Sequence, residues 1–570
     1  MKFPIYTEKT ICRDCYKCVR QCPVKAIKVN DGSAVIVHDL CIFCGRCIEV
    51  CPVNAKKVRS DTARAKQLLK LNETVIASIA PSFPAEFDCT AAELITAIKK
   101  LGFSGVSETS IGAEIVGKDA ASKMDTIKGM LISSACPTVK ELIRKYRPSL
   151  VPRMADTASP LEAHASLLKN TYGKNARVVF IGPCISKKLE ADDETSDIDL
   201  ALTFIELTEW LEAEGIELGG DCDPDAHFIP EQTVKAAEFA VEGGMLNTIR
   251  ASASAIEPDL ISCSGISNII GTFDDIENLK ERNIFLEYLA CDGGCISGRG
   301  MSQTCGYLEK RLRVLDYQQL SLKESLRPAE AAAELEKIIP PAPVRPESFT
   351  DDEIEEVLLS LDKRSKEDEM NCGGCGYNTC RDFAAAILSG KAEQNMCVTN
   401  MRKLAEKKSN ALMKAMPLGV VITDVNEKIL ECNEKFINLF TDIDSSLAPE
   451  AGLRLEGAPL ERLLPGCGIF DKLKNSPLHT TEDKMRIDGK VFRTFAFRIG
   501  KEEMFGAVFQ DITSPAVRRE TIIRKTEEVI EKSLNSVQQI ASLLGENAAE
   551  TQLILNSLIE SYTDNEDHKE

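Results

Sequence analysis

The stretch Cys291-Asp292-Gly293-Gly294-Cys295 lies at the centre of the predicted fold and follows the apolar run Phe285-Leu286-Glu287-Tyr288-Leu289-Ala290. The two glycines remove side-chain bulk and tolerate positive φ, so a large inorganic group can approach the backbone. Two thiolates on such a turn can reach two neighbouring irons. The pair becomes a strong signal together with Cys136 in Ser134-Ala135-Cys136-Pro137 and Cys184 in Gly182-Pro183-Cys184.

Each of these cysteine turns follows a short apolar run that predicts a strand, and predicted helices intervene. The strands are expected at 74–80, 129–132, 177–181 and 283–289, and the helices at 86–101, 159–170 and 203–214. This alternation predicts an α/β fold with a largely parallel sheet. Ligands at the strand ends of such a sheet are typical of its binding sites. Four thiolates from three loops can hold one 4Fe-4S cubane, and their spacing is not that of a zinc finger.

Composition limits the class of protein. A chain of 570 residues should hold several domains, and its net charge of −19 disfavours nucleic acid as a partner. The start of the chain lacks an apolar leader, and no apolar run approaches the roughly 20 residues of a membrane span. The 22 cysteines are spaced as metal ligands rather than as a disulfide framework. We therefore expect a cytoplasmic metalloprotein with no membrane partner.

Residues 1–58 carry a duplicated cysteine pattern. The first run is Cys12-x2-Cys15-x2-Cys18-x3-Cys22-Pro23, and the second is Cys41-x2-Cys44-x2-Cys47-x3-Cys51-Pro52. This is the bacterial two-cluster ferredoxin spacing, in which the fourth cysteine of each run ligates the other cluster. The first 4Fe-4S cluster then takes Cys12, Cys15, Cys18 and Cys51, and the second takes Cys41, Cys44, Cys47 and Cys22. Zinc or disulfides are the alternatives. Residues 26–29 and 34–37 predict a hairpin.

A further cysteine module is predicted at 347–402, after the proline-rich linker 339–346. An acidic helix is expected over 351–361, and a second helix over 381–392 leads back to the last of four cysteines, namely Cys372, Cys375, Cys380 and Cys397. The module resembles the small 4Fe-4S domains appended to corrinoid and redox proteins. A four-cysteine zinc site is the alternative.

The last third of the chain predicts a sensor domain and a helical tail. Strands around 418–424 and 428–432, an asparagine-led helix, and strands at 493–498 and 504–513 resemble a PAS domain over 403–514, with a generic α+β domain as the alternative. In the tail, 515–570, apolar residues spaced by seven from Ile523 to Leu544 predict a coiled coil. A homodimer formed through these two parts is expected.

The central segment, 59–338, resembles the large-subunit catalytic domain of FeFe-hydrogenases. The motifs are Ser134-Ala135-Cys136-Pro137, Gly182-Pro183-Cys184-x2-Lys187-x2-Glu190 and Glu287-x2-Ala290-Cys291-x-Gly293-Gly294-Cys295. The resemblance implies an H-cluster, which is a 4Fe-4S cubane linked to a di-iron unit with CO and cyanide ligands. It implies that Cys136, Cys184, Cys291 and Cys295 hold the cubane, with Cys295 as the bridge. Lys187 and Ser82 would contact the two cyanides, and Ser159 and Glu190 would belong to a proton relay.

Several positions depart from that family. Ala135 replaces the cysteine that passes protons to the di-iron unit, and alanine can neither donate nor accept a proton. Leu289 and Gly182 replace methionines, and the glycine should leave room near the di-iron site. The acidic pair of the relay is not evident around 118–123. These departures favour slow chemistry over rapid turnover.

Three functions are consistent with these features. The first is a sensory FeFe-hydrogenase with reversible, low-turnover H2 oxidation and proton reduction that signals to a regulatory protein through the PAS domain and tail. The second is a catalytic hydrogenase linked to ferredoxin or another redox protein, with a rerouted proton path. The third is a non-enzymatic iron-sulfur redox sensor or assembly protein that never receives the di-iron unit.

Overall fold

A computed structural model describes most of the chain. The described residues are 3–126, 129–219, 223, 225–230, 237–252, 259–279, 282–302, 305–321, 335–345, 347–441, 455–466, 468–474, 479–487, 489–500, 504–513 and 528–533. They form two compact units, Met1–Met396 and Cys397–Glu570.

The first unit begins with the two-cluster module. Strand β1 (Ile5–Thr7) pairs with β4 (Lys56–Val58), and β2 (Ile27–Asn30) forms the predicted hairpin with β3 (Ser33–Ile36). The turn between them, Asp31-Gly32, has positive φ at both residues, which confirms the hairpin expected there. Two short helices, α1 (Lys17–Gln21) and α2 (Arg46–Glu49), occupy corresponding places in the two cysteine runs.

The central segment contains parallel strands, as predicted, but they form two sheets. A four-stranded sheet has the order β6-β5-β8-β9, made of β5 (Val75–Ile79), β6 (Gly105–Glu108), β8 (Arg177–Gly182) and β9 (Leu200–Thr203). A three-stranded sheet has the order β10-β11-β7, made of β7 (Met130–Ile132), β10 (Asp259–Ser264) and β11 (Ile284–Leu289). All residues of β5 and β11 are buried, as expected for strands covered on both faces.

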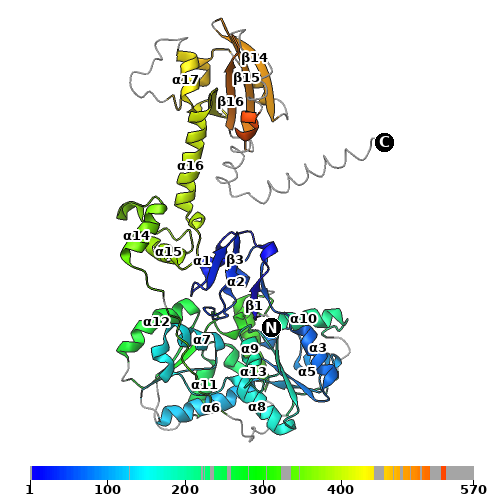
Figure 1. Ribbon diagram of the computed structural model, residues 1–570. Coiled ribbons are helices and arrows are strands. Elements are labelled where there is room, and N and C mark those ends of the chain that lie inside the picture. The colour runs from blue at the N-terminus through cyan, green and yellow to red at the C-terminus, as the bar shows by residue number, and fades with distance from the viewer. Residues whose placement is uncertain are drawn as a thin grey trace. The chain divides into compact units, whose positions relative to one another are not determined.

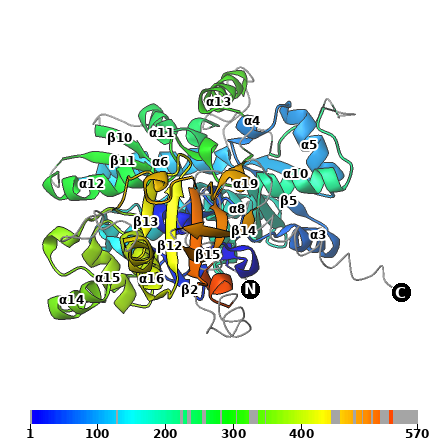
Figure 2. The same cartoon turned by 90° about the horizontal axis from the view of Figure 1, so that it is seen from above.

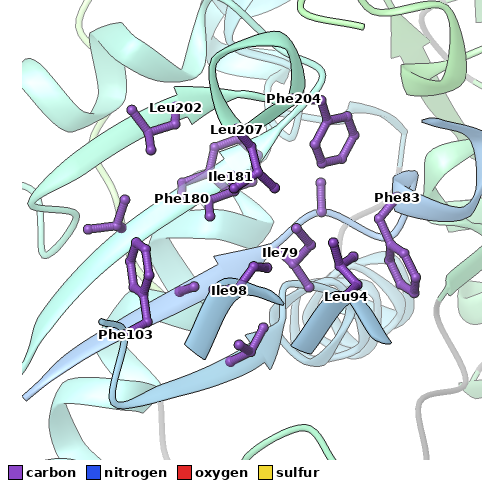
Figure 3. Packing of buried hydrophobic residues seen from close by; sticks show 14 of the residues in the cluster. Ile79, Phe83, Leu94, Ile98, Phe103, Phe180, Ile181, Leu202, Phe204 and Leu207 are labelled. Atoms are coloured by element: carbon purple, nitrogen blue, oxygen red, sulfur yellow. The ribbon is translucent and has the colours of Figure 1, made fainter. Parts of the chain in front are cut away.

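Helices cover both sheets, and the two sheets with their helices lie side by side (Figures 1 and 2). Near the four-stranded sheet, Phe83, Leu94 and Phe204 pack with residues of β5, β8 and β9 in one continuous core (Figure 3). The helices of the segment are α3 (Thr62–Leu71), α4 (Phe83–Glu86), α5 (Ala91–Lys100), α6 (Ser110–Thr126), α7 (Pro137–Tyr146), α8 (Pro160–Tyr172), α9 (Lys187–Asp192), α10 (Phe204–Ala213), α11 (Gly244–Ser252), α12 (Ile266–Asn278) and α13 (Tyr307–Ser321).

The helix predicted over 86–101 is wrong at its start. The chain leaves the short α4 at Glu86, and α5 begins only at Ala91. Thr90 supplies the reason, because its side chain accepts a hydrogen bond from the Glu93 backbone while the Glu93 carboxylate accepts one from the Thr90 backbone. Such a capping box satisfies two backbone donors and fixes a helix start at this point.

The third cysteine module completes the first unit. Helix α14 (Asp351–Ser360) matches the predicted acidic helix, and α15 (Cys380–Leu388) begins after its capping residue Thr379. The predicted helix over 381–392 is therefore too long by one turn. Its end is followed by Gly390, which has a φ of 64° that favours glycine.

The second unit starts with the long helix α16 (Val398–Ala415) and continues into an antiparallel sheet. The strand order is β13-β12-β16-β15-β14, made of β12 (Gly419–Asp424), β13 (Ile429–Cys432), β14 (Thr480–Ile487), β15 (Lys490–Ile499) and β16 (Met504–Asp511). Its helices are α17 (Glu434–Thr441), α18 (Leu460–Leu463) and α19 (Asp471–Lys474). The strands and the helix after Asn433 lie where the sequence predicts them, and the PAS assignment stays a prediction.

The predicted coiled-coil tail, 515–570, lies outside the described residues except for the helical stretch 528–533. None of the described helices combines the length and the apolar character that a membrane span requires.

A buried histidine gives the central segment a predictable pH dependence. The His164 ring is fully buried, with Nδ1 2.8 Å from Ser78 Oγ and Nε2 2.8 Å from Ser107 Oγ, and burial lowers its pKa to about 3. Because the folded-state pKa is lowered, stability is complete above the unfolded pKa of about 6.5 and declines as the pH falls, by about 1.4 kcal/mol per unit. Urea unfolding between pH 7.5 and 5, followed by Trp210 fluorescence, should show this slope.

The slope should be flatter in the His164→Gln variant, since glutamine does not titrate. His227→Gln, at an exposed position, is the control and should keep the wild-type slope. Equal slopes in wild type and His164→Gln would contradict the assignment to this ring.

Candidate functional site

The four cysteines predicted to hold a cubane line one cavity between the two parallel sheets. Cys136 follows β7, Cys184 follows β8, and Cys291 and Cys295 follow β11. The volume of this cavity is about 120 Å³. We call it the four-cysteine cavity. It lies where the carboxyl ends of strands from both sheets meet, so no single local loop builds it.

The diglycine between the last two cysteines is required by the backbone. Gly293 and Gly294 have φ values of 75° and 105°. A Cβ on Gly294 would stand 2.7 Å from the Ala240 carbonyl oxygen, and one on Gly293 would stand 2.2 Å from the Tyr307 ring. Only glycine therefore allows the turn to bring Cys291 and Cys295 to the same cavity.

The protein alone does not favour charged thiolates in the cavity. Burial, reinforced by the neighbouring thiol of Cys136, raises the pKa of Cys184 to about 11. Burial and the neighbouring thiols also raise the pKa values of Cys291 and Cys295. Thiolates here need a compensating positive charge, and bound metal ions supply one. This chemistry fits a metal cluster.

Lys187 lines the cavity and is held by two partners behind it. Its Nζ donates to Glu190 Oε2 at 2.6 Å and to Ser159 Oγ at 2.9 Å, and Ser159 Oγ donates to the same carboxylate oxygen at 2.8 Å. Burial alone would raise the pKa of Glu190, but Lys187 and Lys140 hold it below its usual value. An ammonium has three donors, so Lys187 keeps one for a group in the cavity.

Ser82 supplies a second polar group. Its side chain is fully buried and lines the cavity, and its Oγ has no hydrogen-bond partner among the described residues. A buried hydroxyl without a partner is costly and indicates that a bound group completes the site. The sequence-predicted residues Lys187 and Ser82 therefore lie on the wall of the same cavity, and Ser159 and Glu190 lie behind Lys187.

The residues that depart from the hydrogenase pattern lie at this site too. Ala135 and Leu289 line the cavity, as expected from their positions beside Cys136 and Cys291. The expectation that Gly182 leaves room is wrong. A Cβ there would stand 2.3 Å from the Phe180 ring and 2.8 Å from Ala80 Cβ, so those side chains already fill the space.

Phe239 and Met245 also line the cavity, although no sequence motif singled them out, and so does Glu287, the first residue of the motif that ends at Cys295. Met245 comes from the start of α11, and its sulfur accepts a hydrogen bond from Ser133 Oγ. The sequence around it, Gly243-Gly244-Met245, has no metal-ligand spacing, so no local signal could have identified it. Glu287 is fixed by Ser262 Oγ at 2.6 Å and by the backbone N–H of Gly243 and Met245.

An acidic side chain does occur in the 118–123 segment, but a lysine holds it. Asp119 Oδ2 accepts from Thr157 Oγ1 at 2.7 Å and lies 3.0 Å from Lys123 Nζ, which also contacts Asp156 at 2.6 Å. Asp119 is a single acid between Lys118 and Lys123, so this segment contains no acidic pair.

The two-cluster module brings together cysteines from both runs. Cys22 of the first run lines a small cavity with three cysteines of the second run, Cys41, Cys44 and Cys47. Burial raises the pKa of Cys18 to about 11, and the thiols of Cys12, Cys15 and Cys51 add to the effect, so these four also lie near one another. Both groupings are those that the ferredoxin spacing predicts.

In the third module the cysteines stand at helix starts and on a glycine-rich turn. Cys372 is exposed, Cys375 is partly buried, and Cys380 is the buried first residue of α15. Cys397 is the N-cap residue of α16 in the second unit. Within the described ranges, no three His, Cys, Asp or Glu side chains are placed to hold a single metal ion.

The fold and the thiol-lined cavities define an α/β protein of the iron-sulfur class. Residues 73–299 match the family of the iron-only hydrogenase large subunit, C-terminal domain. Residues 4–52 match a 4Fe-4S dicluster domain, and 368–399 match a putative Fe-S cluster family. The chain thus carries a domain of the FeFe-hydrogenase-like family.

Relatives of different function share this domain. The periplasmic [Fe] hydrogenase large subunit of Nitratidesulfovibrio vulgaris is 28% identical over 295 residues, covering 42% of this chain and 70% of its own. The cytosolic Fe-S cluster assembly factor narfl of Xenopus tropicalis is 25% identical over 321 residues, covering 45% and 67%. A structure of a variant of the [FeFe]-hydrogenase HydA1 from Chlamydomonas reinhardtii is 16% identical, covers 50% and 100%, and has a TM-score of 0.38.

Proposed function

We propose that the protein is a sensory FeFe-hydrogenase, with reversible H2 oxidation and proton reduction at low turnover. The observation that carries this proposal is the cavity itself, in which four cysteines, Lys187 and Ser82 face one space while Ala135 stands where a proton carrier is needed. In this proposal the ligands of the cofactor are kept and the adjacent proton donor is missing.

The residues present fit an H-cluster. Cys136, Cys184, Cys291 and Cys295 would hold the cubane, and Cys295 would join it to the di-iron unit. Lys187 would donate its remaining N–H, and Ser82 its hydroxyl, to the cyanide ligands. When bound, this group supplies the metal centre at which H2 is split or formed. The protein positions it, excludes water from the cavity, and controls how protons reach it.

The remaining parts support signalling. The two 4Fe-4S clusters of the first module and one further 4Fe-4S cluster of the third carry electrons, and the PAS-like domain and tail pass the state to a regulatory partner in the cytoplasm. Ferredoxin or a similar redox protein exchanges electrons with the chain, and the PAS-like domain and tail form a homodimer. A signal of this kind requires an element with two states that bind the partner differently.

Infrared spectroscopy after maturation with the di-iron unit tests the proposal. Bands from CO and cyanide should appear, and hydrogen oxidation should be detectable but slow. Bands without any hydrogen reaction would refute the hydrogenase part, and turnover as fast as in ordinary hydrogenases would refute the sensory part. Lys187→Gln should reduce the band intensity, because glutamine lacks the charge that favours binding of an anionic ligand.

A second candidate is a non-enzymatic iron-sulfur protein that never receives the di-iron unit. The observation in its favour is the similarity to a cytosolic Fe-S cluster assembly factor. It predicts 4Fe-4S signals with no CO or cyanide bands under the same maturation.

A further inference from the structure

The two-cluster module consists of two similar halves, and the backbone shows which residues correspond. A shift of 29 residues places the first cysteine run on the second. Positive φ recurs at the matched positions: Asp14 and Phe43, Tyr16 and Gly45, and Lys25 and Asn54. Helix α1 therefore corresponds to α2, and Arg20 on α1 corresponds to Glu49 on α2.

The second half contacts the domain that contains the four-cysteine cavity. Ser186 Oγ, two residues after Cys184, donates to the Phe43 carbonyl at 2.9 Å, and Lys145 Nζ donates to the Cys41 carbonyl at 2.7 Å. On α2, Glu49 forms an ion pair with Arg299 at 3.1 Å. This half thus lies beside the proposed H-cluster site.

The first half contacts the third cysteine module, and Arg20, which matches Glu49, takes part in this contact. Arg20 donates to the Gly374 carbonyl at 3.3 Å and to the Cys15 carbonyl at 3.1 Å, so it joins the two cysteine turns. Lys25 Nζ donates to the Gly376 carbonyl at 2.6 Å and to the carbonyls of Val19 and Arg20.

The fit between these two surfaces is close. A Cβ on Gly376, whose φ is 97°, would stand 3.0 Å from Val19 Cγ1 and 3.1 Å from the Arg20 nitrogen. Further along the contact, the Val29 N–H donates to the Lys391 carbonyl at 2.9 Å and the Asp31 N–H to Glu393 at 3.0 Å. The interface therefore includes backbone hydrogen bonds as well as the two cationic side chains.

We propose that the third module is a built-in redox partner that docks on the first half of the two-cluster module, with Arg20 and Lys25 as positioning residues. The two halves then use corresponding helices to contact two metal sites, the four-cysteine cavity on one side and the third module on the other. Electrons move along this order, and the exposed Cys372 marks the outer end of the third module.

Each transfer at this interface moves one electron. The group held by Cys12, Cys15, Cys18 and Cys51 is oxidised as the group at Cys372, Cys375 and Cys380 is reduced, and no bond or proton changes. H2, which yields two electrons and two protons, is the reductant if the proposed function holds. Dithionite replaces it in the test, so the docking can be examined in protein that lacks the di-iron unit.

The test uses the full chain with its iron-sulfur clusters, reduced with dithionite and measured by EPR at low temperature. The variant is Arg20→Gln combined with Lys25→Asn, because asparagine occupies the matching position 54 at the same positive φ. The control variant is Lys9→Asn combined with Arg13→Gln. It removes two positive charges from exposed positions of the same half, as many as the Arg20/Lys25 variant removes. Cys375→Ser provides the spectrum of protein with a disrupted third cluster.

The EPR spectra of wild type and control should show line broadening from interaction between the spins of neighbouring reduced clusters. The spectrum of Cys375→Ser should lack the part of this broadening that comes from the third cluster. The Arg20/Lys25 variant should lose the same part while keeping the wild-type iron content. Amide hydrogen exchange at Val29 should be at least tenfold faster in that variant. Unchanged broadening and exchange in the variant would overturn the docking, and a wild-type spectrum from Cys375→Ser would overturn the cluster in the third module. Neither outcome depends on hydrogen chemistry.

Discussion

Hydrogen oxidation by the matured protein is expected to rise about a hundredfold when Ala135 is replaced by cysteine, since a positioned proton-transfer group contributes 10²–10⁴ in rate. Ala135 lies on the cavity wall next to Cys136, and its methyl group can carry no proton. A thiol at this point can exchange protons with a group in the cavity. The measurement is the steady-state rate of dye reduction under H2, normalised to the CO band intensity.

Two controls separate proton transfer from packing. Ala135→Ser has nearly the same size, but its hydroxyl is a much weaker acid than a thiol, so its rate should stay within about threefold of wild type. Leu289→Met restores another family residue on the same wall and should also have a small effect. A rate for Ala135→Cys no higher than that of wild type would contradict the view that Ala135 limits turnover.

The contacts around Thr157 indicate what lies beyond such a thiol. Ser134, next to Ala135, donates to the Thr157 carbonyl at 2.7 Å, and the Thr157 hydroxyl donates to Asp119. Lys123 contacts the carboxylates of both Asp119 and Asp156, at 3.0 and 2.6 Å. The hydrogen bond and charge of Lys123 lower the pKa of Asp156, which makes this carboxyl a poor proton carrier. If Ala135→Cys raises the rate of hydrogen oxidation by less than a hundredfold, we expect the rate to rise further when Lys123→Gln is added.

Local spacing predicted the cysteine groups well, and the reason is physical. In the first 58 residues the ligands lie two or three residues apart, so the chain itself fixes their geometry, including the exchange of Cys22 into the second group. The turns around Cys136, Cys184 and Cys291 follow buried strands whose apolar runs are visible in the sequence. Helix α14 was likewise predicted from its acidic start.

Features that depend on distant packing could not be predicted. The sequence shows that the strands are parallel, but whether β8 pairs with β5 or with β11 depends on contacts between residues far apart in the chain. The space beside Gly182 is filled by Phe180, which lies two residues away on the same strand, and the sequence pattern does not show how that ring packs. Met245 reaches the cavity from α11, about 45 residues before Cys291, with no motif around it.

Loss of the Lys188 charge is expected to destabilise the first unit by about 3–5 kcal/mol, because breaking a buried ion network leaves a carboxylate uncompensated. Lys188 is fully buried and donates to Asp61 Oδ2 at 2.9 Å, to Glu206 Oε1 at 3.0 Å and to the Ala201 carbonyl at 3.0 Å. All three of its donors are used. Asp61 keeps Arg59 and Arg64 as partners when the lysine is removed, so Glu206 bears most of the penalty.

Urea unfolding of Lys188→Met can be followed with Trp210, the single tryptophan of the chain, which is buried on the same helix as Glu206. The midpoint should fall by about 1–2 M, given the slopes usual for urea. Lys99→Met, at an exposed position of α5, should leave it unchanged. Adding Glu206→Gln to Lys188→Met should recover part of the loss, because the unpaired charge is then removed. If the double variant loses as much stability as the sum of the single ones, lost packing rather than uncompensated charge explains the effect.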